Sequence, residues 1–297
     1  MSEQFKAGRD YILINRVIDR ALYYDLSSCV EQNKKNEECS IFLTTTGGDP
    51  HAAFRMGRCV RNSYRHVRIV VPSICKSAGT LFAISANELA VGDNGELGPL
   101  DVQVEKPEEL AERNSGLDIL NALSMINGHA MSVFRAVLQD VRYGARLSTK
   151  LAAEYAAKMA IGSVEPLYAQ IDPTKLSEMN RAMLIASEYG YRLNEYGNNL
   201  RDDNDALGCL LMGYPDHGFV IDRKEARSLF KNVFSPSTLE KSIYTANTHL
   251  LFDPRLQNGP SFINESVKSI MEKMEKGVGE YETKDNDSLR SNSSEQN

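Results

Sequence analysis

The chain has 297 residues, of which 42% are hydrophobic and 25% charged, the mix of a globular protein that can bury a sizeable core. Its 34 Lys and Arg against 40 Asp and Glu give a formal net charge of -6, which argues against a protein that coats nucleic acid. No stretch approaches the roughly 20 apolar residues of a membrane-spanning helix, and the polar N-terminus has no basic-then-apolar signal pattern. We therefore expect a cytoplasmic protein whose partners include neither nucleic acid nor membrane.

The cysteines and histidines do not form the pattern of a metal or disulfide site. The five cysteines are odd in number and widely spaced, without a C-x-x-C pair, and the five histidines are scattered. The nearest approach to a metal motif is the pair Asp49 and His51. A disulfide framework or a thiolate zinc site has a different spacing. We expect reduced thiols in or near the core, and no metal or organic cofactor.

The first half of the chain alternates apolar runs with helical patterns. Because strands that alternate with helices need crossover connections, this order predicts an α/β fold with a buried parallel sheet. Strands are predicted at residues 11–15, 40–44, 67–72 and 88–91, and helices at about 19–33, 52–64 and 77–87.

The second half is mainly helical in its pattern. Long helical segments are predicted at 117–144, 149–158 and 176–199, then a polar break at 202–208, a turn at 213–215 and short helices at 221–232 and 235–247. Residues 277–297 hold few sizeable apolar groups, so we predict a disordered polar tail there. The division expected is one α/β domain over residues 1–276, with a helical insertion at about 107–200.

Three segments rich in small residues follow predicted strands. They are TTTGGDP at 44–50, SICKSAGT at 73–80 and GELGPLDV at 95–102. Ligands of α/β proteins bind outside the carboxyl ends of parallel strands, and adjacent glycines leave backbone amides open to a close approach. Ser77, at a helix start between such amides, has the surroundings that acyl transfer needs. Taken singly, however, a Gly-Gly pair is often only a turn, and a serine in this position is often only an N-cap.

Together these segments resemble a known superfamily. TTTGGDP and the following AAFRMGRCVR are similar to the oxyanion-hole turn and helix of ClpP/crotonase proteins, and KSAGTLFAISANELAVGDNGELGPLD to their nucleophile helix and the segment after it. The greatest similarity is to the serine dehydrogenase proteinases, relatives of ClpP and signal peptide peptidase A. Their three motifs match residues 77–81, 97–103 and 214–226 here, and the resemblance covers about residues 11–229. It implies a spiral of parallel strands and helices with a helical extension.

The resemblance also implies a function, that of a serine peptidase that hydrolyses peptide bonds through an acyl-enzyme. Carried over by position, Ser77 is the nucleophile, and the backbone N–H groups of Gly48 and Ala78 form the oxyanion hole. No metal or cofactor is implied. The expected substrate is a peptide or unfolded protein, and relatives in this superfamily assemble into oligomers, so a homo-oligomer is expected.

The base and its orienting carboxylate depart from the ClpP arrangement. Where ClpP has a histidine, this chain has Leu100 and Asp101, with no histidine near. The Ser, Asp, His order described for the proteinase family points instead to Asp101 as orienter and His217 as base, which fits the titration range of histidine. Asp216 and Asp222 are rival orienters.

A Ser–Lys dyad of the signal peptide peptidase type is the main mechanistic alternative, because a desolvated lysine can act as the base. Lys150 and Lys158 lie on predicted helices after the serine motif, although no motif marks them. Lys76 is interpreted as a charge at the rim of the site. His51, after the glycine turn, is a candidate to line the cleft.

Two other functions remain open from the sequence. A crotonase-like enzyme would stabilise a thioester enolate in the same backbone hole and needs no serine nucleophile. A non-catalytic relative would assemble and bind peptides, an alternative left open by the histidine missing from the ClpP position. No G-x-G-x-x-G follows a predicted strand, so a nicotinamide cofactor is not expected.

Overall fold

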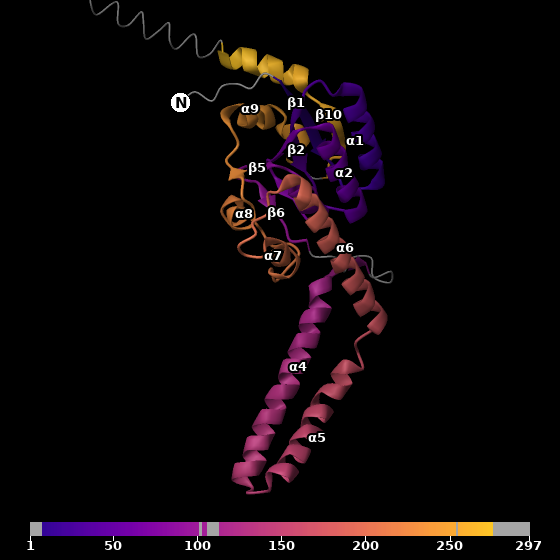
Figure 1. Ribbon diagram of the computed structural model, residues 1–297, viewed down its shortest axis with the longest axis vertical. Helices are drawn as coiled ribbons and strands as arrows, with labels where there is room; N and C mark the ends of the chain where they lie inside the picture. The colour runs from indigo at the N-terminus through magenta and orange to yellow at the C-terminus, as the bar shows by residue number, and fades with distance from the viewer. Residues whose placement is uncertain (1–7, 101–102, 106–112, 254, 276–297) are drawn as a thin grey trace, which may run out of the picture.

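The computed structural model describes residues 8–100, 103–105, 113–253 and 255–275, and for 103–105 and 113–121 the backbone alone. Figure 1 shows an α/β body from which two helices, α4 (Gly116–Gln139) and α5 (Thr149–Tyr168), project as an arm. Helix α6 (Pro173–Gly197) returns the chain from the arm to the body. The predicted tail at 277–297 lies outside the described residues.

The body contains a six-stranded sheet in which five strands run parallel. Their order is β1 (Arg9–Asn15), β2 (Glu38–Thr44), β3 (His66–Val71), β5 (Glu88–Val91) and β9 (Val233–Phe234). At the other edge β10 (Asn258–Phe262) pairs antiparallel with β1. This confirms the predicted α/β class with a mostly parallel sheet.

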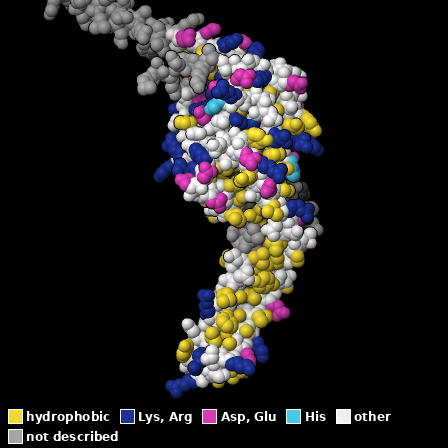
Figure 2. Space-filling model, in the orientation of Figure 1, with side chains coloured by type: hydrophobic (Ala, Val, Ile, Leu, Met, Phe, Trp, Pro, Cys, Tyr) yellow, Lys and Arg dark blue, Asp and Glu magenta, His cyan; other side chains and the backbone are white. Residues whose placement is uncertain are grey.

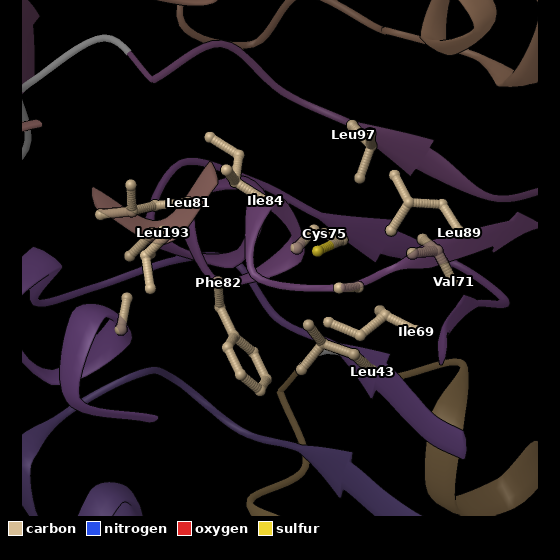
Figure 3. Packing of buried hydrophobic residues seen from close by; sticks show 14 of the residues in the cluster. Leu43, Ile69, Val71, Cys75, Leu81, Phe82, Ile84, Leu89, Leu97 and Leu193 are labelled. Atoms are coloured by element: carbon tan, nitrogen blue, oxygen red, sulfur yellow. The ribbon is translucent and has the colours of Figure 1, made fainter. Parts of the chain in front are cut away.

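Both faces of the sheet are buried, which explains why its strands are apolar at successive positions. Side chains alternate between the faces along a strand. In β1, Ile12 and Ile14 pack with the core on the side of α1 (Arg20–Asn33), α2 (Pro50–Ser63) and α3 (Ala78–Ile84). Leu13, between them, packs in a second cluster with α9 (Thr238–Ala246), α10 (Thr248–Leu251) and residues 264–275. Figure 3 shows part of the first cluster, with Phe82 of α3 against Leu43 and Ile69 of the sheet.

Every strand and helix that the sequence predicts is present, with shifted ends, and the structure adds elements that local pattern did not indicate. Helix α5 runs ten residues beyond its predicted end at 158, and β10 was not predicted. The predicted polar break at 202–208 contains the start of α7 (Ala206–Met212), because the carboxylate of Asp205 accepts the Gly208 N–H and caps the helix. The short helix predicted from residue 221 is α8 (Arg223–Leu229), capped by Asp222.

The arm exposes large apolar side chains on α4 and α5, and Figure 2 shows them as patches along its length. Small residues instead face inward, since Ala152, Ala156 and Ala160 of α5 are buried. The exposed set on the two helices is Met125, Met131, Leu151, Tyr155, Met159, Ile161, Leu167 and Tyr168. Within the described part of the chain, no helix combines the length and apolarity needed to cross a membrane.

An ion-pair network at the start of β5 generates a prediction about acid stability. The carboxylate of Glu88 lies 3.3 Å from His66 Nε2 and 2.7 Å from Arg68 Nη1. The hydrogen bond from His66 and the Arg68 guanidinium lower the pKa of Glu88 from 4.5 to about 2. Because the unfolded chain then binds a proton more readily than the native chain, the contribution of Glu88 to stability is present above pH 4.5 and is lost as the pH falls toward 2.

We expect the free energy of unfolding, measured in urea, to fall over this pH interval in the wild type and to fall less steeply in Glu88→Gln. Glu188→Gln removes a carboxylate from an exposed i,i+4 pair and serves as the control, with the wild-type slope. An unchanged slope in Glu88→Gln would show that other groups set the acid sensitivity.

Candidate active site

Ser77 lies in a sharp turn between β4 (Ile74–Cys75) and α3. Its φ of 50° and ψ of -115° match the second residue of a type II′ turn, at about +60° and -120°, a position that favours glycine. The Gly79 N–H closes the turn by donating to the Lys76 carbonyl at 2.8 Å. A non-glycine residue in such a conformation costs about 1–3 kcal/mol, and strain of this kind gathers at functional sites.

The glycine turn at 47–48 lies directly against this serine. Gly47 and Gly48 have φ of 104° and 139°, values that side chains rarely adopt. A Cβ on Gly47 would lie 2.9 Å from Ser77 Cβ and 3.5 Å from the Ala78 nitrogen, and one on Gly48 would lie 2.1 Å from the Ile18 carbonyl oxygen. Two glycines are therefore required for the turn to approach both the serine and the preceding loop.

Backbone hydrogen bonds fix the glycine turn to the serine segment. The Thr45 N–H donates to the Ile74 carbonyl at 2.9 Å, and the Lys76 N–H donates to the Thr45 carbonyl at 3.1 Å. These parallel, strand-like bonds join the end of β2 to β4 just before Ser77. The relative position of the two turns is thus set by backbone pairing.

The sequence assigned the backbone N–H groups of Gly48 and Ala78 to an oxyanion hole. Among hydrogen bonds between described residues, neither the Gly48 nor the Ala78 N–H is a donor. Gly48 is exposed, Ser77 is half-buried, and the serine side chain makes no capping hydrogen bond to α3. Both N–H groups are therefore unused by the described part of the chain.

Thr80 fixes the third small-residue segment beside the serine helix. Its buried hydroxyl lies 3.0 Å from the Cys75 carbonyl oxygen and 2.8 Å from that of Gly98, and it accepts the Gly98 N–H at 3.2 Å. The sequence did not single out this positioning residue, because its partners are backbone groups that no sequence pattern marks. Asp101, the predicted orienter, lies three residues beyond Gly98 and outside the described residues.

Lys76 connects the serine segment to the turn that carries His217. Its ammonium group pairs with Glu96 at 2.8 Å and donates to the carbonyls of Leu97 at 3.2 Å and Phe219 at 3.1 Å. The backbone two residues after His217 is therefore bonded to the residue before Ser77. His217 itself is half-buried. Lys76, interpreted from the sequence as a rim charge, is a positioning residue for three segments.

The two rival orienters serve as local caps in the structure. The carboxylate of Asp216 accepts the Gly218 N–H at 2.9 Å within the turn, and that of Asp222 accepts the Glu225 N–H at 2.8 Å at the start of α8. Each carboxylate therefore has a backbone partner in its own turn.

The lysines considered for a dyad lie far from the serine within one chain. Lys150 and Lys158 are exposed on α5, which Figure 1 places in the arm, away from the sheet. His51 is also exposed, and its Nδ1 lies 2.9 Å from the Tyr189 hydroxyl. Among the described residues, none of these three side chains takes part in the hydrogen bonds of Thr45, Lys76 or Thr80, which hold the segments around Ser77.

Cys75, under the serine turn, is not a rival nucleophile. It is fully buried, and burial raises the pKa of its thiol to about 12. The thiolate, which is the reactive form, is therefore disfavoured. The five cysteines are free thiols, as predicted, and no three metal-binding side chains gather among the residues that the structure describes.

Comparisons with known proteins give distant similarities. No protein-family model matches the chain. An uncharacterized protein of Methanocaldococcus jannaschii is 30% identical over 70 residues, which is 24% of this chain and 24% of that protein. The chain thus matches about a quarter of the length of this curated relative.

Two solved structures of a protease show a weak likeness. A serine-to-alanine mutant of the 1510-N membrane-bound stomatin-specific protease has a TM-score of 0.33 and 18% identity, covering 52% of this chain and 71% of that one. A lysine-to-alanine mutant of the same protease, in complex with a substrate peptide, has a TM-score of 0.33 and 19% identity, covering 52% and 68%. Similarity at this level is a distant resemblance to a serine protease and carries no argument about the chemistry of this chain.

The strain at Ser77 generates a stability prediction that does not depend on activity. Ser77→Gly removes the Cβ that makes the positive φ costly, whereas Ser77→Ala keeps it. We expect Ser77→Gly to unfold with a free energy about 1 kcal/mol higher than Ser77→Ala, measured by chemical denaturation, because the relieved strain exceeds the added entropy of unfolded glycine. A Ser77→Gly variant less stable than Ser77→Ala would contradict a strained turn.

Proposed function

We propose that this chain is a serine peptidase of the ClpP/crotonase-like fold that hydrolyses peptide bonds through an acyl-enzyme on Ser77. The observation that supports it most is the contact between the glycine turn and the strained serine. There the half-buried Ser77 lies against the glycine turn, and the Gly48 and Ala78 N–H groups donate to no acceptor among the described residues. This is the arrangement of a nucleophile next to an oxyanion hole.

The proposed reaction assigns one role to each residue. The Ser77 hydroxyl oxygen attacks the peptide carbonyl carbon while His217 accepts the hydroxyl proton. The negatively charged oxygen of the tetrahedral intermediate then accepts hydrogen bonds from the Gly48 and Ala78 N–H groups. His217 then returns the proton to the leaving amine as the peptide bond breaks. Water, deprotonated by His217, next attacks the ester carbonyl carbon, and His217 gives that proton to the Ser77 oxygen as the bond to the acyl group breaks. Asp101 would orient the imidazole and stabilise its charged form. These steps need no metal and no organic cofactor.

The test is peptidase activity on an unfolded protein. We expect Ser77→Ala to lower the hydrolysis of fluorescent casein by at least about 1,000-fold, with a similar loss in His217→Ala, because triad members act as a unit. Ser73→Ala is the matched control, since that serine precedes the site by four residues and its side chain makes no hydrogen bond among the described residues. Full activity in Ser77→Ala, or none in the wild type, would refute the proposal.

We also propose that the chain self-associates through its arm. A helical hairpin that projects from the body cannot bury its outer apolar side chains within one copy, and Met159 and Ile161 of α5 are 57% and 60% exposed. Exposed apolar surface of this extent marks interaction sites in soluble proteins. In a homo-oligomer, the arm of a second copy would cover these apolar side chains.

The molar mass of the protein, measured by light scattering as it elutes from a size-exclusion column, tests this assembly. The wild type is expected to have a mass of two or more times 33.1 kDa, and the double variant Met159→Lys/Ile161→Lys to have a smaller mass, because charged groups do not enter an apolar interface. Tyr24→Lys, at a 55% exposed position on α1 in the body, is the control with unchanged mass. A monomeric wild type would exclude the assembly.

A further inference from the structure

A groove of about 820 Å³ lies along α1 and α2, outside the candidate active site. One wall is a stripe of α1 at the spacing of a helix face, with Arg20, Tyr23 and Ser27. The other wall is a stripe of α2 that includes Arg55 and Arg58. Tyr189 of α6 covers the first half of α2, where its ring stacks on Phe54 at 4.2 Å and its hydroxyl meets His51.

The groove is basic in a chain whose net charge is -6. Arg20, Arg55 and Arg58 line it and are exposed, and among the described residues none of the three makes an ion pair or a hydrogen bond. Asp49 is the single acidic residue of the lining, and its carboxylate already accepts the His51 N–H at the start of α2. Three arginines therefore line the groove with guanidinium donors that no described residue uses.

Aromatic rings position two of these guanidinium groups. The Arg55 group lies over the Tyr23 ring at 5.6 Å, and the Arg58 group over the Phe54 ring at 5.9 Å. Such contacts restrict a long side chain while its N–H donors remain at the edge of the guanidinium plane. A planar fork of donors held in this way matches the two oxygens of a carboxylate.

The groove begins where the glycine turn ends. At its first end Asp49 directly follows Gly48, and His51 comes two residues later. Asn62 and Ser63 lie at the other end of α2. A helix of 14 residues is about 20 Å long, which an extended polypeptide covers with about six residues. A polypeptide bound at Ser77 could thus continue along α2 past all three arginines.

We propose that this groove binds an acidic segment of a polypeptide, and that it selects substrates carrying a run of Asp or Glu near the cleaved bond. The substrate role rests on the proposed function, whereas the binding follows from the charge and shape of the groove. A nucleic acid fits less well, because Asp49 stands at the end nearest the site and the chain as a whole is acidic.

The experiment is fluorescence anisotropy of fluorescein-labelled hexaglutamate with the full chain carrying Ser77→Ala, so that no hydrolysis occurs. Binding is expected at low salt, to weaken as salt is raised, and to be at least about fivefold weaker in a further Arg55→Gln/Arg58→Gln variant, as two lost carboxylate contacts imply. Arg181→Gln, an exposed arginine on α6 outside the groove, is the control with unchanged affinity.

Three results would overturn the proposal. They are no binding of hexaglutamate, equal affinity in the Arg55→Gln/Arg58→Gln variant, and tighter binding of labelled hexaglutamine. A single-stranded oligonucleotide that binds more tightly than hexaglutamate, and loses affinity in the same variant, would reassign the groove to nucleic acid.

A second measurement separates this proposal from the peptidase proposal. In the protein with Ser77 intact, the Arg55→Gln/Arg58→Gln variant is expected to lower kcat/KM about fivefold for a peptide with six glutamates, and to leave unchanged that of the matched glutamine peptide. Binding without any hydrolysis would refute the peptidase proposal alone, and hydrolysis without preference for the acidic peptide would refute the groove as a substrate site.

Discussion

The candidate site depends on the close approach of two backbones, that of the glycine turn and that of Ser77. A Cβ on Gly47 would lie 2.9 Å from Ser77 Cβ, so the distance that backbone pairing sets between the turns is possible only because Gly47 has no side chain. At this approach Ser77 has a positive φ, which serine disfavours. The surrounding pairing of Thr45 with Ile74 and Lys76 supplies the hydrogen bonds that keep this conformation.

The buried parallel sheet determines where these turns meet. Helices α1 and α2 each carry the chain back to the amino ends of the strands, so that β1, β2 and β3 run in the same direction. The carboxyl ends of β2 and β3 therefore lie at the same edge of the sheet, and the segments after them are neighbours. Lys76 and Thr80 then attach two later segments, residues 96–98 and 218–219, to the same point. The Lys76 ammonium group thus holds together backbone segments that are more than 140 positions apart in the chain.

The parts of the fold that sequence predicts are those with local physical signals. Apolar runs between polar or glycine-rich segments predicted the strands, and Asp19, at the start of a predicted helix, caps that helix in the structure. The helix predicted from residue 52 begins two residues earlier, after the cap Asp49. The sequence predicts that the segments of Gly47 and Ser77 lie at the same edge of the sheet, but not that the two residues are in contact. Their separation depends on backbone pairing between segments 30 residues apart in the chain. The roles of Lys76 and Thr80 could not be predicted, since their partners are backbone carbonyls that no sequence pattern marks. Strand β10 lacked a strand pattern and forms through its pairing with β1.

The claim that Ser77 is an activated nucleophile has one most direct test. The wild-type chain is treated with a fluorophosphonate, which forms a covalent bond with the oxygen of an activated serine, and the modified residue is located by tandem mass spectrometry of the digested protein. The account predicts a single adduct on Ser77, formed more slowly in His217→Ala, because the imidazole would no longer accept the hydroxyl proton. An unlabelled wild-type protein, or an adduct on another residue while Ser77 stays unmodified, would contradict it.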